Sequence, residues 1–418
     1  MLTVKTPEEV LEVIFERFKT LGHPAENVLT ADLLGRVLSG DIVADEFVPG
    51  FDRSTVDGYA VLASDTFGCS DSIPAVLELS GEILMGKAAN CAIKPGVCFA
   101  VSTGGDLPEG TDAVVMLEHT EDYGDGLIGI MTPAASGNNI IYKGSDISPG
   151  DRILAEGAVI GSHDIGLLSA LGVGSVGVRP KPLVGIISTG DELVKPSETP
   201  RPGQVRDVNA PMLKALMEQS GAEAVSYGIV RDDERALRNA VATAAAQCDV
   251  VLISGGSSAG MRDLTARVIG NLGEMLLHGV AMKPGKPTIL GDIGGKAVFG
   301  LPGHPAAAWF VAELFVRPLT ARLAGVVSTR RTVTACLSEA ISSNHGREEY
   351  VAVQFTIHNV RNNAECGMQN AELSGWLVRP VRSKSGLISG LTRADGYICI
   401  PRDSEGLHKD TLVSVVLF

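Results

Sequence analysis

Hydrophobic residues recur along this chain with different spacings in different regions, and the spacing predicts the secondary structure. Residues 7–19 repeat apolar side chains at helical spacing, and Thr6 stands where an N-cap is expected. Residues 29–39 predict a second short helix. Residues 45–146 are rich in Gly, Pro and short β-branched runs such as AVLEL and DAVVML, which predicts a β-rich insertion. Residues 147–180 return to turns and one helix over SHDIGLLSALG.

Residues 183–320 alternate between apolar runs and helical patterns. The strands are expected at LVGIIST, AEAVSYGIV, DVVLIS and AVFGLPG, and long amphipathic segments follow each of them. This alternation predicts a parallel sheet with helices on both faces, in which ligands bind beyond the carboxyl ends of the strands. Residues 328–418 lose the helical period and predict a small β domain.

The expected fold is therefore multidomain α/β plus β, with a central parallel α/β domain, a β-rich insertion domain and a C-terminal β domain. A chain of 418 residues is too long for one compact core. The double proline in VRPKP marks a boundary near residue 180. The expected domains are a helical or linker domain from two segments, a β-rich domain, the α/β domain and the C-terminal domain, at residues 1–44 with 147–180, 45–146, 181–327 and 328–418.

Charge and cysteine content narrow the function. The net charge of −14 argues against a nucleic-acid partner, and it requires any anion site to be locally basic. Seven cysteines without a C-x-x-C pair predict reduced thiols. The N-terminus lacks a signal-peptide pattern and no apolar run reaches about 18 residues, so we expect a cytoplasmic protein that does not span a membrane.

Residues that suit an anionic ligand gather behind the strand DVVLIS. The strand ends in Ser254-Gly255-Gly256, where small side chains leave backbone N–H groups free to face an anion. Lys283 and Lys286 follow in KPGKPT, between prolines that restrict the loop. Two fixed ammonium groups can bind a phosphate, so a phosphorylated ligand is expected here.

Carboxylates at the expected strand ends suit a divalent cation. Asp191 and Glu192 follow the strand LVGIIST, where paired acids can hold Mg²⁺ or accept a proton. Asp263 could also hold a cation; a helix N-cap is the structural alternative for Asp263, and a solvated loop acid is the alternative for Glu192. Four further polar residues precede helices, and capping explains them well: Asp207, Asn209, Asp232 and Asp233.

Several motifs occur in a fixed order along nearly the whole chain. They are DRSTVDGYA at 52–60, STGGDLPEG at 102–110, DAVVMLE at 112–118, STGDEL at 188–193, SGGSSAG with Asp263, KPGKPT at 283–288 and GLPGHPAAA at 300–308. In this order they resemble the molybdopterin molybdenumtransferase family, which includes MoeA and the E domain of gephyrin.

The resemblance implies four domains and a homodimer with its active site in a cleft between subunits. Family members take adenylylated molybdopterin, made upstream by a molybdopterin adenylyltransferase, together with molybdate. They hydrolyse the adenylate with the help of magnesium, insert the metal into the dithiolene and release AMP. A role in molybdenum cofactor biosynthesis is therefore expected.

The resemblance also assigns roles to residues. Asp57, Thr103, Glu192 and Asp263 are the expected catalytic residues, and Glu192 and Asp263 the expected Mg²⁺ ligands. An Asx-turn aspartate and a strand-to-turn threonine are the structural alternatives for Asp57 and Thr103. The expected substrate-binding residues are Ser254, Gly255, Gly256, Lys283, Lys286, Gly303 and Ser385. His304, in a Gly-His-Pro turn, is expected to be a spacer.

Two departures keep alternatives open. The family often has Arg and Glu where this chain has Ile141 and Ser145. Losing both charges could leave the local balance intact or alter oxyanion handling, so tungstate stays an alternative to molybdate. A non-catalytic scaffold is a second alternative. A molybdopterin adenylyltransferase or a CinA-like pyrophosphatase is disfavoured, because those proteins resemble only the central unit.

Overall fold

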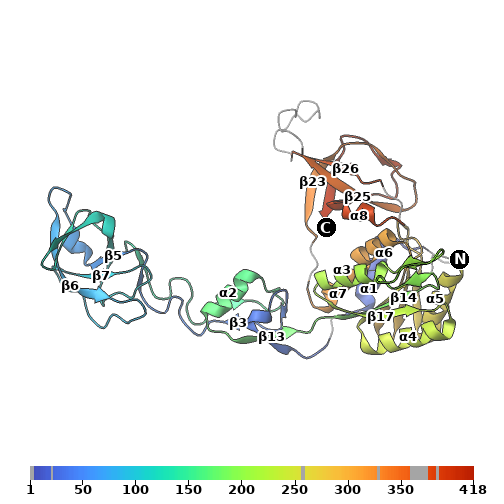
Figure 1. Ribbon diagram of the computed structural model, residues 1–418, viewed down its shortest axis with the longest axis horizontal. Helices are drawn as coiled ribbons and strands as arrows, with labels where there is room; N and C mark the ends of the chain where they lie inside the picture. The colour runs from blue at the N-terminus through green and yellow to red at the C-terminus, as the bar shows by residue number, and fades with distance from the viewer. Residues whose placement is uncertain (1–3, 20–21, 256–258, 327–329, 358–374, 383–385) are drawn as a thin grey trace. The chain divides into compact units, whose positions relative to one another are not determined.

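The computed structural model describes residues 4–19, 22–255, 259–326, 330–357, 375–382 and 386–418 (Figure 1). The chain forms two compact units. The first comprises Met1–Glu26, Gly35–Val37 and Val178–Phe418, and the second comprises Asn27–Leu34 and Leu38–Gly177. The expected division into four domains stays a prediction.

The second unit is built around a six-stranded sheet. Its strand order is β8-β5-β7-β6-β10-β9, and all pairs are antiparallel except β6 with β7. Apolar side chains form two buried clusters here, one around Ile128 and one around Phe99. The sheet strands are β5 (Gly58–Val61), β6 (Ala75–Ile83), β7 (Val97–Val101), β8 (Ala113–Met116), β9 (Thr120–Gly124) and β10 (Leu127–Ile130). The β-rich character expected of this region is confirmed.

Shorter elements complete this part of the chain. The helix expected in SHDIGLLSALG is present as α2 (Ser162–Ala170). The remaining elements are β3 (Ile42–Val43), β4 (Arg53–Ser54), η2 (Ala63–Thr66), η3 (Leu117–His119), β11 (Ile140–Ile141), β12 (Arg152–Leu154) and β13 (Ser175–Arg179).

The helix predicted over residues 29–39 is wrong. The chain there forms the end of β1 (Glu26–Leu29), a single 3₁₀ turn η1 (Thr30–Asp32) and β2 (Val37–Leu38). Gly35 adopts φ 72°, in the left-handed region that an α-helix excludes. The segment is too short for its apolar spacing to outweigh this break.

The α/β sheet of the first unit has the order β17-β14-β18-β22-β21-β19. The strands predicted from the alternation are present, and their parallel pairing is confirmed. A central difference is β21, which runs antiparallel to both of its neighbours. The strands are β14 (Leu183–Thr189), β17 (Glu223–Val230), β18 (Val250–Gly255), β19 (Glu274–His278), β21 (Ile289–Ile293) and β22 (Lys296–Leu301).

Helices cover both faces of this sheet, as predicted (Figure 1). One buried cluster joins the sheet to α1 (Pro7–Arg17), α3 (Asn209–Gln219) and the long helix that begins at Pro305. The other joins it to α4 (Glu234–Gln247) and α5 (Ala259–Leu272). Such two-sided burial explains why the sequences of β14, β18 and β22 are nearly continuous apolar runs.

The N-cap predicted for α1 is confirmed. Thr6 Oγ1 accepts from the N–H of Glu9 at 3.2 Å, and the Glu9 carboxylate accepts from the N–H of Thr6 at 2.7 Å. This reciprocal pair satisfies two donors at the start of the helix. At its end, Arg17 donates to Asp292 at 2.5 Å and to Glu274 at 2.8 Å, which fixes α1 against β21 and β19.

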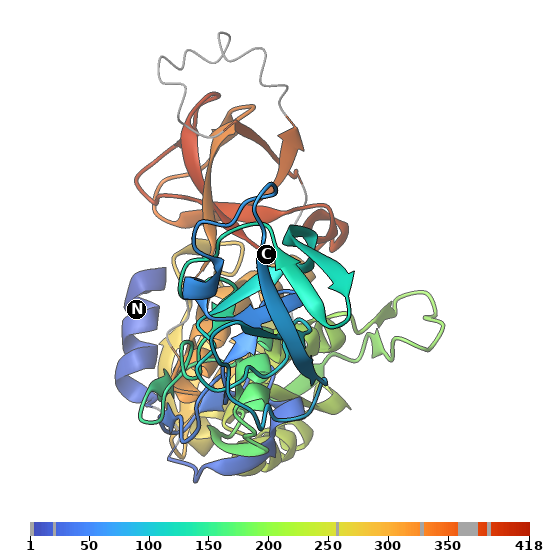
Figure 2. The same ribbon diagram turned by 90° about the vertical axis from the view of Figure 1, so that its left-hand side faces the viewer.

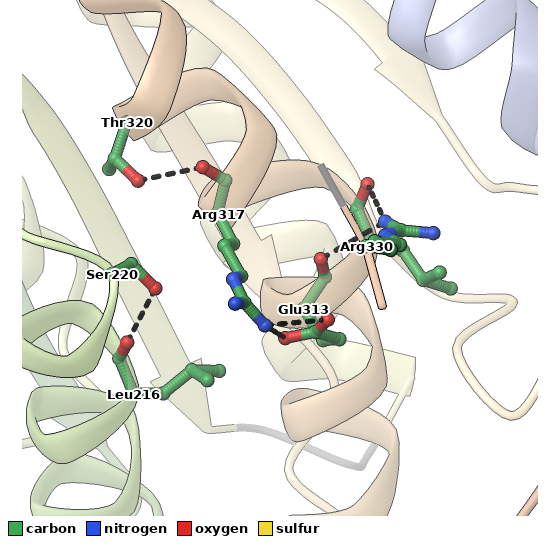
Figure 3. Close-up of polar contacts among 7 residues, drawn as sticks. Leu216, Ser220, Glu313, Arg317, Thr320 and Arg330 are labelled. Carbon is green, nitrogen blue, oxygen red and sulfur yellow. Dashed lines mark hydrogen bonds and ion pairs between the residues drawn. The ribbon is translucent and has the colours of Figure 1, made fainter. Parts of the chain in front are cut away.

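The long helix from Pro305 contains a π-helical segment. The chain passes from α6 (Pro305–Val311) through η4 (Ala312–Val316) into α7 (Arg317–Leu323). Pro318 lies in the first turn of α7 and has no N–H to donate to the preceding turn. Arg330 compensates by donating to the carbonyls of Glu313 at 3.3 Å and Leu314 at 3.4 Å (Figure 3). Pro318 therefore accounts for the irregular turn, and Arg330 satisfies carbonyl groups in it.

A buried ion pair accompanies this segment. The side chain of Glu313 is only 2% exposed, and both of its oxygens lie 3.1 Å from Nη1 of Arg317 (Figure 3). Arg317 is 36% exposed, so its other nitrogens can reach water. A carboxylate this deeply buried depends on its partner for stabilisation.

A second buried carboxylate, Asp249, lies at the amino end of β18. It accepts from the N–H of Leu183 at 2.9 Å and from Lys296 Nζ at 2.8 Å, and His23 Nε2 lies 3.4 Å away. Burial opposes its ionisation, but these three donors outweigh burial and hold the pKa of Asp249 below its usual value. The cluster joins the segment after α1 to the sheet.

The C-terminal region forms a closed barrel. Its sheet order is β20-β25-β26-β23-β29-β27, and a further pairing of β25 with β27 closes the ring. Five aromatic rings pack between the barrel and α6: Trp309, Phe310, Tyr350, Tyr397 and Phe418. The elements are β20 (Met282–Lys283), β23 (Thr332–Leu337), β24 (Ile341–Ser342), β25 (Glu348–Ile357), β26 (Trp376–Pro380), α8 (Ser389–Thr392), β27 (Gly396–Ile400), β28 (Gly406–Leu407) and β29 (Leu412–Leu417).

A short two-stranded arm leaves the α/β sheet between β14 and α3. It is formed by β15 (Leu193–Val194) and β16 (Val205–Arg206), and it extends away from the helices (yellow-green in Figure 2). Among the residues described, none of the helices is long and apolar enough to cross a membrane.

Candidate functional site

A cavity of about 1100 Å³ lies in the first unit, between the α/β sheet and the barrel. Its wall includes the KPGKPT loop, the start of α6 and strand β25. Five side chains that are or can be cationic line it: Lys283, Lys286, His304, Arg347 and Arg382. The cavity is therefore locally basic in a chain of net charge −14. Its size and charge fit a large anionic ligand.

The lysine loop is held by hydrogen bonds within itself. Thr288, which is 1% exposed, donates its hydroxyl to the carbonyl of Gly285 at 2.6 Å. The N–H of Val280 donates to the carbonyl of Lys286 at 2.9 Å. A loop fixed in this way presents its charges at defined positions, as the prolines around Lys283 and Lys286 predicted.

Lys283 has a carboxylate partner from the barrel. Strand β20 pairs in parallel with β25, so that Lys283 lies opposite Glu349. Lys283 Nζ is 2.7 Å from Glu349 Oε1, and Ser343 donates its hydroxyl to Glu349 Oε2 at 2.7 Å. Arg382 is paired with Glu339 at 2.8 Å. Lys286 and Arg347, in contrast, have no carboxylate partner among the residues that the structure describes.

A buried network lies beneath the carboxyl ends of β14, β18 and β22. Ser188 donates to Asp207 at 2.5 Å. Asn209, 7% exposed, donates through Nδ2 to Ser254 Oγ at 2.8 Å and to the carbonyl of Gly303 at 2.9 Å. Ser254 is itself only 1% exposed. The predicted ligand-binding residues Ser254 and Gly303 thus meet here, with the Ser254 hydroxyl directed to Asn209.

Gly255 ends β18 in a conformation that few other residues adopt. Its φ is 150°, and an added Cβ would lie 1.9 Å from the carbonyl oxygen of Thr189 on β14. Glycine is required because backbone approaches backbone at this point. The predicted Gly256 lies outside the described residues, as does Ser385.

The expected metal ligands Glu192 and Asp263 are both exposed. The Glu192 carboxylate lies beside Gly190, where an added Cβ would approach Glu192 Oε2 to 2.7 Å. Asp263 is the fifth residue of α5 and is therefore not its N-cap. Within the described ranges, no group of three or more His, Cys, Asp or Glu side chains is placed to hold a metal ion.

The capping explanation holds for some acidic residues and not for others. Asp233 caps α4 by accepting from the N–H of Ala236 at 2.8 Å, and Asp207 accepts from the N–H of Ala210 at 3.1 Å. Asp232 instead accepts from the Thr189 hydroxyl at 3.0 Å, and its own N–H donates to Asp191 at 3.3 Å. Asp232 is therefore a third carboxylate near the end of β14, beside Asp191 and Glu192. The prediction that it caps a helix is wrong.

Asp57 and Thr103 lie in the second unit and contact each other. Asp57 Oδ1 accepts from the N–H of Thr103 at 2.7 Å and from its hydroxyl at 3.0 Å. Both residues are exposed. The carboxylate therefore holds the STGGD loop in place through one of its two oxygens. Ile141 pairs with Arg53 in the β4–β11 ladder of the same unit.

Comparison with known proteins covers almost the whole chain. Three family models match it: the MoeA N-terminal region (domain I and II) at residues 5–172, a probable molybdopterin binding domain at 185–322, and the MoeA C-terminal region (domain IV) at 334–418. The molybdopterin molybdenumtransferase of Bacillus subtilis is 32% identical over 100% of this chain and 95% of its own length. This chain belongs to the MoeA family.

Further MoeA relatives extend the agreement to structure. A putative molybdopterin biosynthesis protein of Methanocaldococcus jannaschii is 32% identical over 100% of this chain and 98% of its own. A crystal structure of the MoeA protein of Pyrococcus horikoshii OT3 matches with a TM-score of 0.82 and 31% identity, covering 100% of both chains. The match includes the regions on both sides of the central α/β domain. This excludes the two alternatives that resemble that domain alone, a molybdopterin adenylyltransferase and a CinA-like pyrophosphatase.

Proposed function

We propose that this MoeA-family transferase of molybdenum cofactor biosynthesis binds adenylylated molybdopterin and a metal oxyanion, transfers the metal to the dithiolene and releases AMP. We also propose that it works in the cytoplasm as a homodimer, downstream of a molybdopterin adenylyltransferase. The single observation that carries the substrate assignment is the basic cavity of about 1100 Å³. A pterin with a phosphate and a metal oxyanion offers several negative groups to its cationic wall.

The residues divide into roles by their positions. Lys283, Lys286 and Arg347 would bind anionic groups in the cavity. Asn209, whose amide is fixed by Ser254, would support the strand ends from beneath. Asp57 and Thr103 would present their loop to the oxyanion.

The carboxylates proposed for a magnesium site are Glu192, which follows β14, and Asp263, which lies on α5. Mg²⁺ is often bound by one or two carboxylates together with substrate phosphates and water. Glu192 and Asp263 would hold it, since both carboxylates are exposed. When bound, the ion would neutralise charge that develops on the phosphates.

The decisive experiment measures AMP release from adenylylated molybdopterin and Mg²⁺ without oxyanion, with molybdate and with tungstate. Oxyanion-dependent AMP release, with metal recovered in the pterin, is the expected result. The preferred anion separates molybdenum from tungsten insertion. Absence of AMP release from folded protein would reject the enzyme assignment and favour the scaffold alternative.

Site variants test the assigned carboxylates. Glu192→Gln and Asp263→Asn are expected to keep pterin binding but to slow AMP release at least tenfold. Asp233→Asn is the matched control, because it removes the same charge near the same sheet edge while Asn still caps a helix well. If either site variant releases AMP at the wild-type rate, that carboxylate has no role in hydrolysis.

A further inference from the structure

The cavity contains one anionic side chain of its own. Glu349 is the single carboxylate among the described residues that line it. Its side chain is 13% exposed, whereas its partner Lys283 is 44% exposed. Both carboxylate oxygens are occupied, one by Lys283 and the other by Ser343. The most enclosed cation–anion contact of the cavity is therefore already satisfied within the protein.

We propose that Glu349 is an internal counter-anion for Lys283. An incoming tetrahedral oxyanion or phosphate group must displace the Glu349 carboxylate from Lys283 before it can bind there. This inference rests on the proposed function, because it takes Lys283 as an anion-binding residue. The register of β20 against β25 places the two side chains opposite each other, so their contact follows from the backbone pairing. Glu349 thus lowers the affinity of the site for anions in general.

Displacement has a defined physical cost. An anion bound to Lys283 would leave the nearly buried Glu349 with only the Ser343 hydroxyl, beside a second negative charge. That cost falls on every anion, but a doubly charged ligand gains more from the remaining cations of the wall, Lys286 and Arg347. The preference for dianions over chloride and other monovalent competitors therefore comes from Lys286 and Arg347, whereas Glu349 sets a minimum attraction that any bound anion must exceed.

The opposite role for Glu349 is to orient Lys283 toward the ligand. A carboxylate that holds an ammonium group in place can raise the affinity for an anion by reducing its freedom. The two roles give changes of opposite sign when the charge of Glu349 is removed, so one variant distinguishes them.

The experiment is calorimetric titration of the full-length protein with molybdate, tungstate and inorganic phosphate at low ionic strength, without pterin. Glu349→Gln keeps an acceptor for Ser343 and should fold, which its thermal transition will check. We expect it to bind molybdate about tenfold more tightly than wild type, equal to about 1.4 kcal/mol. A gain confined to molybdate and tungstate identifies an oxyanion subsite, and an equal gain with phosphate identifies a phosphate subsite.

Glu348→Gln is the matched control. It lies next in sequence and removes the same charge, but its carboxylate accepts from the Tyr350 hydroxyl at 2.5 Å. Its affinity for molybdate should equal that of wild type. The double variant that carries both Lys283→Gln and Glu349→Gln should lack the gain in molybdate affinity expected of Glu349→Gln alone.

Molybdate binding by Glu349→Gln that is unchanged or weaker would overturn the inference. The inference would also fail if neither wild type nor Glu349→Gln bound molybdate. The proposed function is tested separately by AMP release. Tighter binding without AMP release rejects the enzyme assignment alone, whereas oxyanion-dependent AMP release with unchanged binding by Glu349→Gln rejects the counter-anion alone.

Discussion

Removal of Arg317 is expected to destabilise the first unit more than removal of its partner Glu313. Arg317→Met deletes both 3.1 Å contacts to the carboxylate but keeps much of the aliphatic stem. Glu313 is then a charge with 2% exposure and no cationic partner from α7. Breaking a buried pair in this way costs about 3–5 kcal/mol. Because water can reach the space left by Arg317, which is 36% exposed, we expect the lower end, about 3 kcal/mol.

Glu313→Gln removes the carboxylate charge and leaves the Arg317 guanidinium without its anionic partner. The Arg317 guanidinium can turn toward solvent, so about 1 kcal/mol is expected, as for a lost hydrogen bond. Arg267→Met is the control, since its pair with Glu234 is exposed on both sides at 3.6 Å and is worth about 0.5 kcal/mol. Urea unfolding followed by the fluorescence of Trp309 and Trp376, which both lie in the first unit, compares the three variants. Equal losses for Arg317→Met and Arg267→Met would refute the reasoning.

Three further changes have definite expected outcomes. Asp249→Asn should lower the unfolding free energy at pH 7 by about 2 kcal/mol. Because the pKa of Asp249 is lowered in the folded state, the difference in unfolding midpoints should begin to shrink as pH falls below about 4 and should vanish only below the folded-state pKa; a constant difference would contradict this. Gly255→Ala should cost about 3 kcal/mol, since its Cβ meets the Thr189 carbonyl, and wild-type thermal stability would exclude that contact. Asp57→Ala should slow AMP release more than Thr103→Ala, which keeps the backbone hydrogen bond to the carboxylate; equal rates would show that the loop needs no such support.

The α/β fold was predictable because its sequence signals agree with one another. The predicted strands β14, β18 and β22 are buried on both faces, which makes their sequences continuously apolar, and the helices have clear apolar faces. The strands β19 and β21 were missed because both are short, because Gly291 interrupts β21, and because β21 pairs antiparallel to its neighbours. The π-helical segment was missed for a related reason, since its partner Arg330 lies beyond the helix in sequence.

The candidate site was predictable only in part. Lys283 and Lys286 were identified because prolines restrict the loop that carries them, and both lysines line the cavity. Arg347 and Glu349 lie on or beside a strand whose sequence resembles any other strand of the barrel. Nothing local in HGREEYVAV distinguishes a carboxylate that faces a ligand cavity from one that accepts from a tyrosine.

The pairing register decides that difference. Lys283 opposes Glu349 because β20 joins the barrel in parallel with β25, and a shift by one residue would bring Glu348 or Tyr350 to the same place. The position of Lys283 is thus set by residues near it in sequence, whereas its availability to a ligand is set by a strand from another part of the chain. In an acidic protein this distinction decides function, because a lysine already neutralised binds anions only when its internal partner can be displaced.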